Sequence, residues 1–186
     1  MNVQESSLPG VLIIEPSVFT DSRGFFQETY EQDRYRNAGM PATFVQDNLS
    51  RSRRGVLRGL HFQLRRPQGK LVQVLDGEVF DVAVDLRRKA DTFGRWVGAI
   101  LSAENHRQIY VPPGFAHGFY VLSDSATLVY KCSDIYDPQS ERTLIWNDRE
   151  IGIEWPMQNP PILAEKDAAG LPLASCEVYE DDDVVA

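Results

Sequence analysis

The segment RGLHFQ, residues 58–63, places His61 in a run that otherwise has the composition of a buried strand. Arg58 stands just before this histidine and Lys70 follows soon after it. Imidazole is the side chain that most readily acts as a general base near neutral pH. A nearby cation could stabilise the negative charge that develops on a carbonyl oxygen when a neighbouring proton is removed. These residue types therefore indicate acid–base chemistry on a keto substrate.

A second histidine, His117, lies in PPGFAHGF, residues 112–119, which has the pattern Pro-x-Gly-x-x-His. This pattern resembles the second motif of the cupin superfamily, where the histidine binds a metal. The first cupin motif is not complete, because Lys70 stands where a metal-binding glutamate would be expected and residues 61–63 offer one imidazole instead of two. An ammonium group repels a metal ion. We therefore expect a cupin-like barrel with no bound metal.

Short β-rich runs separated by turn residues must position these groups. The strand candidates are 11–14, 24–29, 56–62, 96–101, 106–111, 118–122 and 126–132, and two more flank Asp76-Gly77 within 69–87. Asp-Gly is a strong signal for a hairpin turn. Helical periodicity is weak, with short candidates at 30–37 and 102–105. Many short strands predict a mainly β protein, a cupin-like jelly-roll β-barrel with short helices that could hold one small ligand.

The strand around His61 must also be irregular if Arg58 is to share a ligand with it. Side chains alternate between the two faces of an ideal strand, so residues three positions apart lie on opposite faces. A bend or bulge near Gly59 would bring both side chains to one face. We therefore predict an irregularity at this glycine.

Composition limits the class of protein. The 186 residues, of which 42% are hydrophobic and 25% charged, suggest one globular domain over residues 1–186. No run approaches the ~18 apolar residues of a membrane helix, and the first residues do not have the pattern of a signal peptide. Cys132 and Cys176 form no CxxC pattern. We therefore expect a cytoplasmic protein with no membrane partner.

The distribution of charge indicates the kind of ligand. The net charge of -8 argues against nucleic acid as a partner. Residues 48–75 nevertheless contain no acidic side chain. The basic side chains in this stretch are Arg51, Arg53, Arg54, Arg58, Arg65, Arg66 and Lys70. Local positive charge in an acidic protein suits a compact anion such as a diphosphate better than a polymer.

Several segments, taken in order, resemble the dTDP-4-dehydrorhamnose 3,5-epimerase family. They are FTDSRGFFQETY (19–30), QDNLSRSRRGVLRGLHFQ (46–63), PQGKLVQVLDGEVFDVAVDLR (67–87), FGRW (93–96), LSAENHRQIYVPPGFAHGFYVLSD (101–124), YKCSDIY (130–136) and the WND…IGIEWP stretch (146–156). The resemblance implies a jelly-roll homodimer. It also implies a cofactor-free epimerisation at C3 and C5 of a dTDP-4-keto-6-deoxyhexose, in the synthesis of dTDP-L-rhamnose.

The resemblance also implies a role for individual residues. His61 matches the general base, Asp167 its carboxylate partner, Lys70 the cation near the enolate, and Tyr130 the acid that returns a proton to the opposite face. Tyr136 matches the aromatic that stacks on thymine. The positions that match substrate-contacting residues are Arg23, Glu28, Gln46, Asp47, Asn48, Arg58, Lys70, His117, Tyr136, Glu141 and Lys166. Imidazole as base and a protonated phenol as acid suit opposite faces of a sugar ring.

Three other functions remain open at this point. A single-site epimerase from an antibiotic-sugar pathway would share His61 and Tyr130, and the motifs do not separate it from a double epimerase. A non-catalytic cupin that binds a sugar nucleotide would be free to lose either residue, and this chain has both. A metal-dependent cupin oxygenase would bind iron, and Lys70 argues against it.

Overall fold

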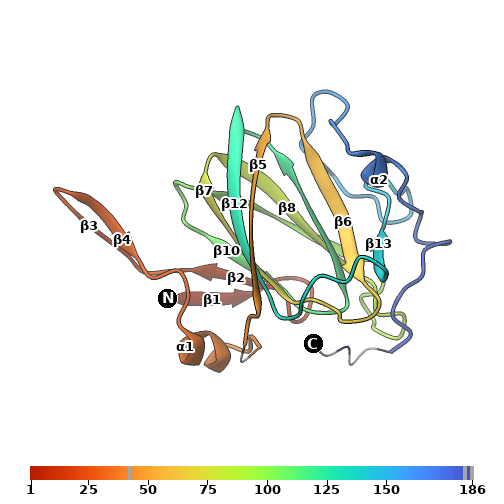
Figure 1. Ribbon diagram of the computed structural model, residues 1–186, viewed down its shortest axis with the longest axis horizontal. Coiled ribbons are helices and arrows are strands. Elements are labelled where there is room, and N and C mark those ends of the chain that lie inside the picture. Colours follow the sequence, from red (N-terminus) through yellow and green to blue (C-terminus); the bar gives the residue numbers. More distant parts are fainter. Residues whose placement is uncertain (42, 182–183, 185–186) are drawn as a thin grey trace.

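The computed structural model describes residues 1–41, 43–181 and 184, and consists mainly of two antiparallel sheets that face each other (Figure 1). The first sheet contains, in spatial order, β1 (Asn2–Glu5), β2 (Leu12–Glu15), β10 (Gln108–Val111), β7 (Lys70–Asp76), β12 (Ser125–Cys132) and β5 (Gln46–Arg53). The second contains β13 (Glu141–Thr143), β6 (Leu57–Gln63), β11 (Phe115–Val121), β8 (Glu78–Asp85) and β9 (Trp96–Ser102). This is the predicted jelly-roll architecture.

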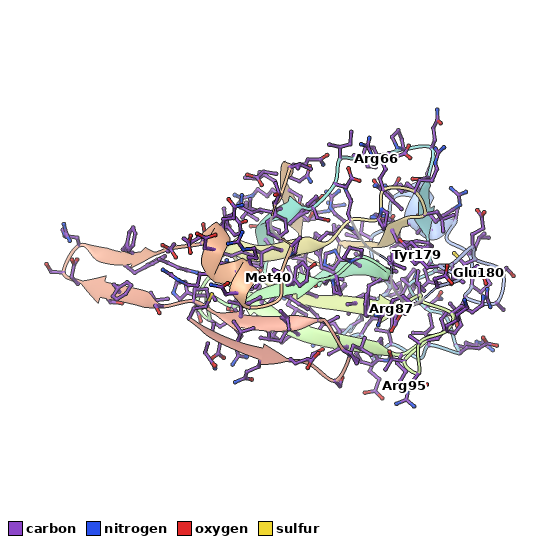
Figure 2. The ribbon with its side chains drawn as sticks, turned by 90° about the horizontal axis from the view of Figure 1, so that it is seen from below. Met40, Arg66, Arg87, Arg95, Tyr179 and Glu180 are labelled. Atoms are coloured by element: carbon purple, nitrogen blue, oxygen red, sulfur yellow. The ribbon has the colours of Figure 1, made fainter. Side chains whose placement is uncertain are left out.

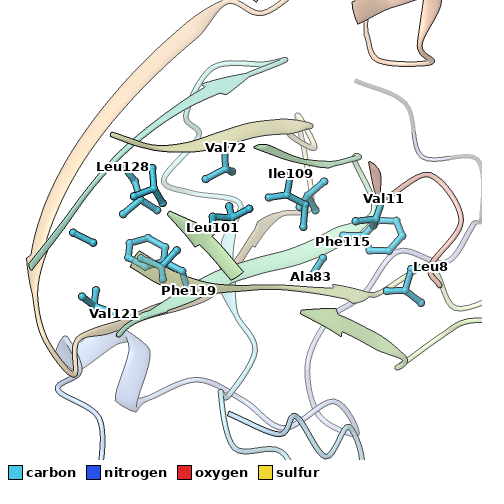
Figure 3. Packing of buried hydrophobic residues seen from close by; sticks show 14 residues of the cluster. Leu8, Val11, Val72, Ala83, Leu101, Ile109, Phe115, Phe119, Val121 and Leu128 are labelled. Carbon is cyan, nitrogen blue, oxygen red and sulfur yellow. The ribbon is translucent and has the colours of Figure 1, made fainter. Parts of the chain in front are cut away.

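A hydrophobic core lies between the two sheets (Figure 3). The first sheet contributes Val72, Ile109 and Leu128, and the second contributes Ala83, Leu101, Phe115 and Phe119. Alternation of side chains along each strand sends every second residue into this layer. The core occupies only part of the space between the sheets, because polar residues replace apolar ones toward β5, β6 and β13.

The outer face of the second sheet is also buried, because the C-terminal segment crosses it. Tyr179 accepts a backbone hydrogen bond from Arg88 at 2.8 Å and donates one to Leu86 at 3.1 Å. Figure 2 shows Tyr179 beside Arg87, at the end of the molecule away from the β3–β4 hairpin. A second hydrophobic cluster lies under this segment. Burial on both faces explains why β11 reads as an almost continuous apolar run around His117.

The predicted hairpin at Asp76-Gly77 is wrong. β7 pairs with β10 and β12, whereas β8 pairs with β11 and β9, so the chain passes from one sheet to the other at this turn. Gly77 has φ +79°, and a Cβ there would lie 2.0 Å from the carbonyl oxygen of Ser125. The glycine therefore permits a sharp turn against β12. The Asp-Gly dipeptide indicated the turn, but it did not indicate which sheet each flanking strand joins.

The helices differ in part from the prediction. α1 (Gln32–Asn37) lies within the expected 30–37 segment. The expected helix at 102–105 is instead a turn, in which Ser102 and Asn105 exchange side-chain-to-backbone hydrogen bonds of 3.0 Å. Such bonds compete with helix formation. The second helix is α2 (Glu165–Ala168), which the sequence pattern did not indicate.

The predicted irregularity at Gly59 is present. Between β6 and β11, His61 pairs with His117 and Arg58 pairs with Phe119, so β6 carries one extra residue over this interval. Gly59 has φ +130°, and a Cβ there would lie 2.6 Å from the Cα of Gly118. Only glycine fits this close approach without displacing the backbone of β11.

A hairpin of β3 (Val18–Asp21) and β4 (Gly24–Gln27) projects from the body of the molecule (Figure 1). Its phenyl side chains at Phe19, Phe25 and Phe26 are 64%, 62% and 68% exposed. Among the described residues, no helix has the length and apolar character needed to cross a membrane.

Candidate active site

A cavity of about 360 Å³ opens between the two sheets, beyond the end of the hydrophobic core. The structure brings together on its walls most of the predicted site residues. These are Gln46, Asn48, Arg58, His61, Lys70, His117, Tyr130, Tyr136, Glu141, Lys166 and Asp167. β5, β6 and β7 carry five of them, and four of these five, all except Gln46, belong to residues 48–75, which contain no acidic side chain.

His61 and Asp167 form a direct pair at the cavity wall. The Nε2 atom of His61 lies 2.5 Å from Oδ1 of Asp167, although the two residues are 106 positions apart. Asp167 is 2% exposed and His61 21% exposed. An ionised carboxylate only accepts hydrogen bonds, so it holds the proton on Nε2 and leaves Nδ1 with its lone pair. The pair therefore presents a free basic nitrogen on an oriented ring.

The surroundings of His61 favour its neutral form. Burial lowers the pKa of His61, and the positive charges of Lys166 and Lys70 lower it further. The hydrogen bond and negative charge of Asp167 act in the opposite direction. The result is a pKa below the ordinary histidine value, which keeps the ring unprotonated and able to accept a proton at neutral pH.

Lys70 and Tyr130 occupy the wall formed by the first sheet. Lys70 begins β7 and Tyr130 lies on β12, whereas His61 belongs to the second sheet. Burial raises the pKa of Tyr130, so its phenol stays protonated at neutral pH. Burial lowers the pKa of Lys70. A base and a proton donor thus face the same cavity from opposite sheets.

His117 forms a second histidine–carboxylate pair. Its Nε2 atom lies 2.9 Å and 3.0 Å from the two carboxylate oxygens of Asp81 on β8. Asp81 was not selected from the sequence, although an acidic residue inside the apolar run VFDVAV is a usable signal for a buried partner. Ser52 was also missed, and its hydroxyl accepts a 2.9 Å hydrogen bond from Nε of Arg58.

The outer part of the cavity contains a cluster of hydrogen-bonded polar groups. The hydroxyl of Tyr136 donates to Glu141 at 3.0 Å, and Nζ of Lys166 lies 2.9 Å from the same carboxylate. Gln46 accepts a hydrogen bond from the backbone of Tyr136 at 2.9 Å and donates to Asn48 at 3.0 Å. Tyr136 is 49% exposed, so its ring is available to a ligand at the rim.

Three predicted contact residues lie outside this cavity. Arg23 is at the tip of the β3–β4 hairpin, 88% exposed and paired with Asp21. Glu28 follows the hairpin and pairs with Arg34. Asp47 is on the outward face of β5, where it pairs with Lys131 at 3.0 Å. Within this chain, none of the three is among the residues that line the cavity.

The described residues contain no group of three or more His, Cys, Asp or Glu side chains that could hold a metal ion. The two histidines of the cavity each bind one carboxylate, and Lys70 lies on the same walls.

Comparison with known proteins identifies the family. A sequence model described as dTDP-4-dehydrorhamnose 3,5-epimerase matches residues 5–175. This chain belongs to the dTDP-4-dehydrorhamnose 3,5-epimerase family. An epimerase of that name from Pseudomonas aeruginosa is 54% identical over 180 residues, which cover 96% of this chain and 99% of the relative. One from Methanothermobacter thermautotrophicus is 51% identical and covers 94% of this chain and 96% of its own length.

Solved structures of the family agree with this fold. The dTDP-6-deoxy-D-glucose-3,5-epimerase from Legionella pneumophila, in complex with dTDP-4-keto-L-rhamnose, has a TM-score of 0.94 and 49% identity, covering 96% of this chain and 97% of its own. A 3′-monoepimerase from Streptomyces bikiniensis, in complex with dTDP-quinovose, has a TM-score of 0.86 and 35% identity, covering 91% and 87%. Proteins described as double and as single epimerases thus share this fold.

Proposed function

We propose that this protein is a dTDP-4-dehydrorhamnose 3,5-epimerase. It inverts C3 and C5 of dTDP-4-dehydro-6-deoxy-D-glucose to give dTDP-4-dehydro-L-rhamnose, a step in dTDP-L-rhamnose synthesis. The observation that carries the proposal is that His61, paired with Asp167 of α2, approaches a single cavity from one sheet and Tyr130 approaches it from the other. The level of identity to curated 3,5-epimerases also favours double over single epimerisation.

Each epimerisation proceeds through an enolate. Nδ1 of His61 takes the proton from the carbon next to the C4 ketone, and the C–H bonding electrons move to the carbonyl oxygen. Lys70 stabilises the resulting negative charge, so the step needs no metal or cofactor. Tyr130 then gives its phenolic proton to the opposite face of the carbon, and the ketone re-forms. Proton transfer from the His61 imidazolium through water to the Tyr130 phenolate restores the starting state.

The remaining cavity residues hold the nucleotide and the sugar. Arg58, fixed by Ser52, can form charge-assisted hydrogen bonds to the diphosphate. Tyr136 at the rim can stack on thymine, and His117 can hydrogen-bond the sugar. We also assign substrate contacts to the polar residues around them. These are Gln46 and Asn48 on β5.

We further propose a homodimer in which the β3–β4 hairpin of one chain reaches the cavity of its partner. The hairpin leaves the body of the molecule with three exposed phenyl groups, and it carries Arg23 and Glu28 away from their own cavity. Burial of such an apolar surface favours association. Mixed dimers of Arg23→Ala and His61→Asn chains should be more active than the homodimer of either variant, because one of their two sites contains both native residues. No recovery on mixing would place Arg23 outside the partner's site.

The proposed location is the cytoplasm. Both cysteines, Cys132 and Cys176, are free thiols in buried positions. Proteins of oxidising compartments more often pair their cysteines in disulfides. Cell fractionation with an antibody to the protein tests this assignment, and recovery in a secreted or membrane fraction would contradict it.

The decisive experiment is incubation with dTDP-4-keto-6-deoxyglucose in deuterated water, followed by NMR of the sugar. Incorporation of deuterium at both C3 and C5 supports the double epimerase. Incorporation at one carbon would identify a single-site epimerase. No incorporation, together with tight binding of the nucleotide, would identify a binding protein and overturn the proposed enzyme.

A further inference from the structure

The short helix that carries Asp167 is attached to the body of the molecule at two distant points. On one side, Ile162 exchanges backbone hydrogen bonds of 2.8 Å and 3.1 Å with Gly55 and Leu57. On the other, Leu171 exchanges bonds of 2.9 Å with Thr143 and Ile145. Helix α2, a single turn too short to be stable alone, lies between these attachments. Its position therefore depends on side-chain contacts.

The hydrogen bonds and ion pairs of the described residues give α2 two side-chain contacts with the body. One is Asp167 with His61, at 2.5 Å. The other is Lys166 with Glu141, where Nζ lies 2.9 Å and 3.1 Å from the two carboxylate oxygens. The residue that precedes the helix, Ala164, makes no side-chain cap. The pair formed by Lys166 is thus the second tether of the segment that presents Asp167.

Glu141 is a rigid attachment for this tether. It lies on β13, which is hydrogen-bonded to the strand of the base: Glu141 pairs with Gln63, and Thr143 pairs with His61. Its side chain is 19% exposed and also accepts the Tyr136 hydroxyl at 3.0 Å. The carboxylate is therefore held in place by strand pairing and by a second hydrogen bond, next to the base itself.

We propose that Lys166 and Glu141 are positioning residues, whose ion pair fixes α2 against β13 and so keeps Asp167 aligned with His61. This inference rests on the proposed function and deepens it, because the family resemblance implies only substrate contact for these two positions. A carboxylate that orients a histidine must be held to a fraction of an ångström. A tether one residue away from Asp167 supplies that restraint.

The substitution that tests the tether is Lys166→Met, which keeps a long apolar stem and removes the ammonium group. We expect kcat to fall roughly twofold to fivefold, the range of a partly exposed ion pair. The dissociation constant of dTDP, measured by calorimetry, should change by less than about twofold. Lys166→Arg, which can re-form the pair, should restore most of kcat. A large loss of dTDP affinity with unchanged kcat would instead make Lys166 a substrate contact.

The pH profile separates positioning from a simple charge effect. The charged and titratable groups around His61 come from several elements. They are Asp167 and Lys166 on α2, Glu141 on β13, Lys70 on β7, His117 on β11 and Tyr130 on β12. Loss of the Lys166 charge alone would raise the pKa of His61, whereas loss of alignment with Asp167 lowers it. We expect the acid limb of kcat to move to lower pH, and a shift to higher pH would overturn the proposal.

Arg142→Met is the matched control. Arg142 is next to Glu141 on β13 but pairs with Glu177 at 2.5 Å, away from α2. The Arg142→Met substitution should lower the thermal stability slightly and leave kcat and its pH profile unchanged. Deuterium incorporation by the wild-type protein is measured in parallel. If the wild type exchanges no sugar proton, the proposed function fails; if it exchanges normally and Lys166→Met matches it in rate and pH profile, only the tether fails.

Discussion

The cavity contains two histidine–aspartate pairs that differ in how the fold builds them. His117 and Asp81 lie on neighbouring strands of one sheet, β11 and β8, and are both buried. His61 is on a strand, but Asp167 comes from a one-turn helix near the end of the chain. The first pair has two contacts between nitrogen and carboxylate oxygens, at 2.9 Å and 3.0 Å, and the second has one at 2.5 Å.

This difference suggests different tasks for the same two residue types. A pair on adjacent strands is fixed by backbone hydrogen bonds, so it suits a static part of the cavity wall. A base must reach the substrate and change protonation state in each cycle, which requires some exposure and an oriented partner. His61 has both features, and its position opposite His117 in the strand pairing places the two histidines side by side in the cavity.

The largest expected effect comes from replacing the base. His61→Asn should lower kcat by about 10³-fold, because general base catalysis typically contributes 10²–10⁴. His117→Asn should lower kcat/KM by about tenfold, mainly through KM, as expected for a binding contact. Deuterium incorporation at C3 and C5 gives the rates. Equal losses of exchange in the two variants would remove the functional distinction between the pairs.

Replacing the carboxylates should give the next largest effects. The two replacements should differ in what they change: one lowers kcat and the other lowers stability. Asp167→Asn should lower kcat by about 10²-fold with little change in melting temperature, since an amide no longer fixes the tautomer of His61. Asp81→Asn should lower the free energy of unfolding by about 3 kcal/mol, because it disrupts a fully buried pair. Steady-state kinetics and urea unfolding of both variants test this prediction. A destabilised Asp167→Asn protein with normal kcat would reverse the assignment.

The two pairs also show what can be read from the sequence and what cannot. His61, Lys70 and the need for an irregular strand at Gly59 followed from local residue types and from the alternation of side chains. The sheet that each strand beside Asp76-Gly77 joins could not be predicted in this way. Turn residues indicate that the chain reverses, but the sheet that each strand joins depends on long-range packing. Asp167 and Tyr130 were assigned from family resemblance. No periodicity in residues 165–168 indicates a helix, and its contact with His61 spans 106 positions.

The smallest expected effect is a shift in pH dependence, and it also distinguishes the pairs. Burial holds the pKa of His61 below the ordinary value of about 6.5. The neutral ring is the active form, so kcat/KM should fall only as the pH drops below that value, through the folded-state pKa. Between the folded and unfolded pKa values the unfolded chain binds more protons, so the free energy of unfolding also decreases as pH falls.

Asp167→Asn should move the acid limb of kcat/KM to still lower pH, because the carboxylate stabilises the protonated ring of His61. Asp81→Asn should leave the acid limb in place. A shift of the acid limb in the Asp81→Asn variant would instead identify His117 as the base that titrates.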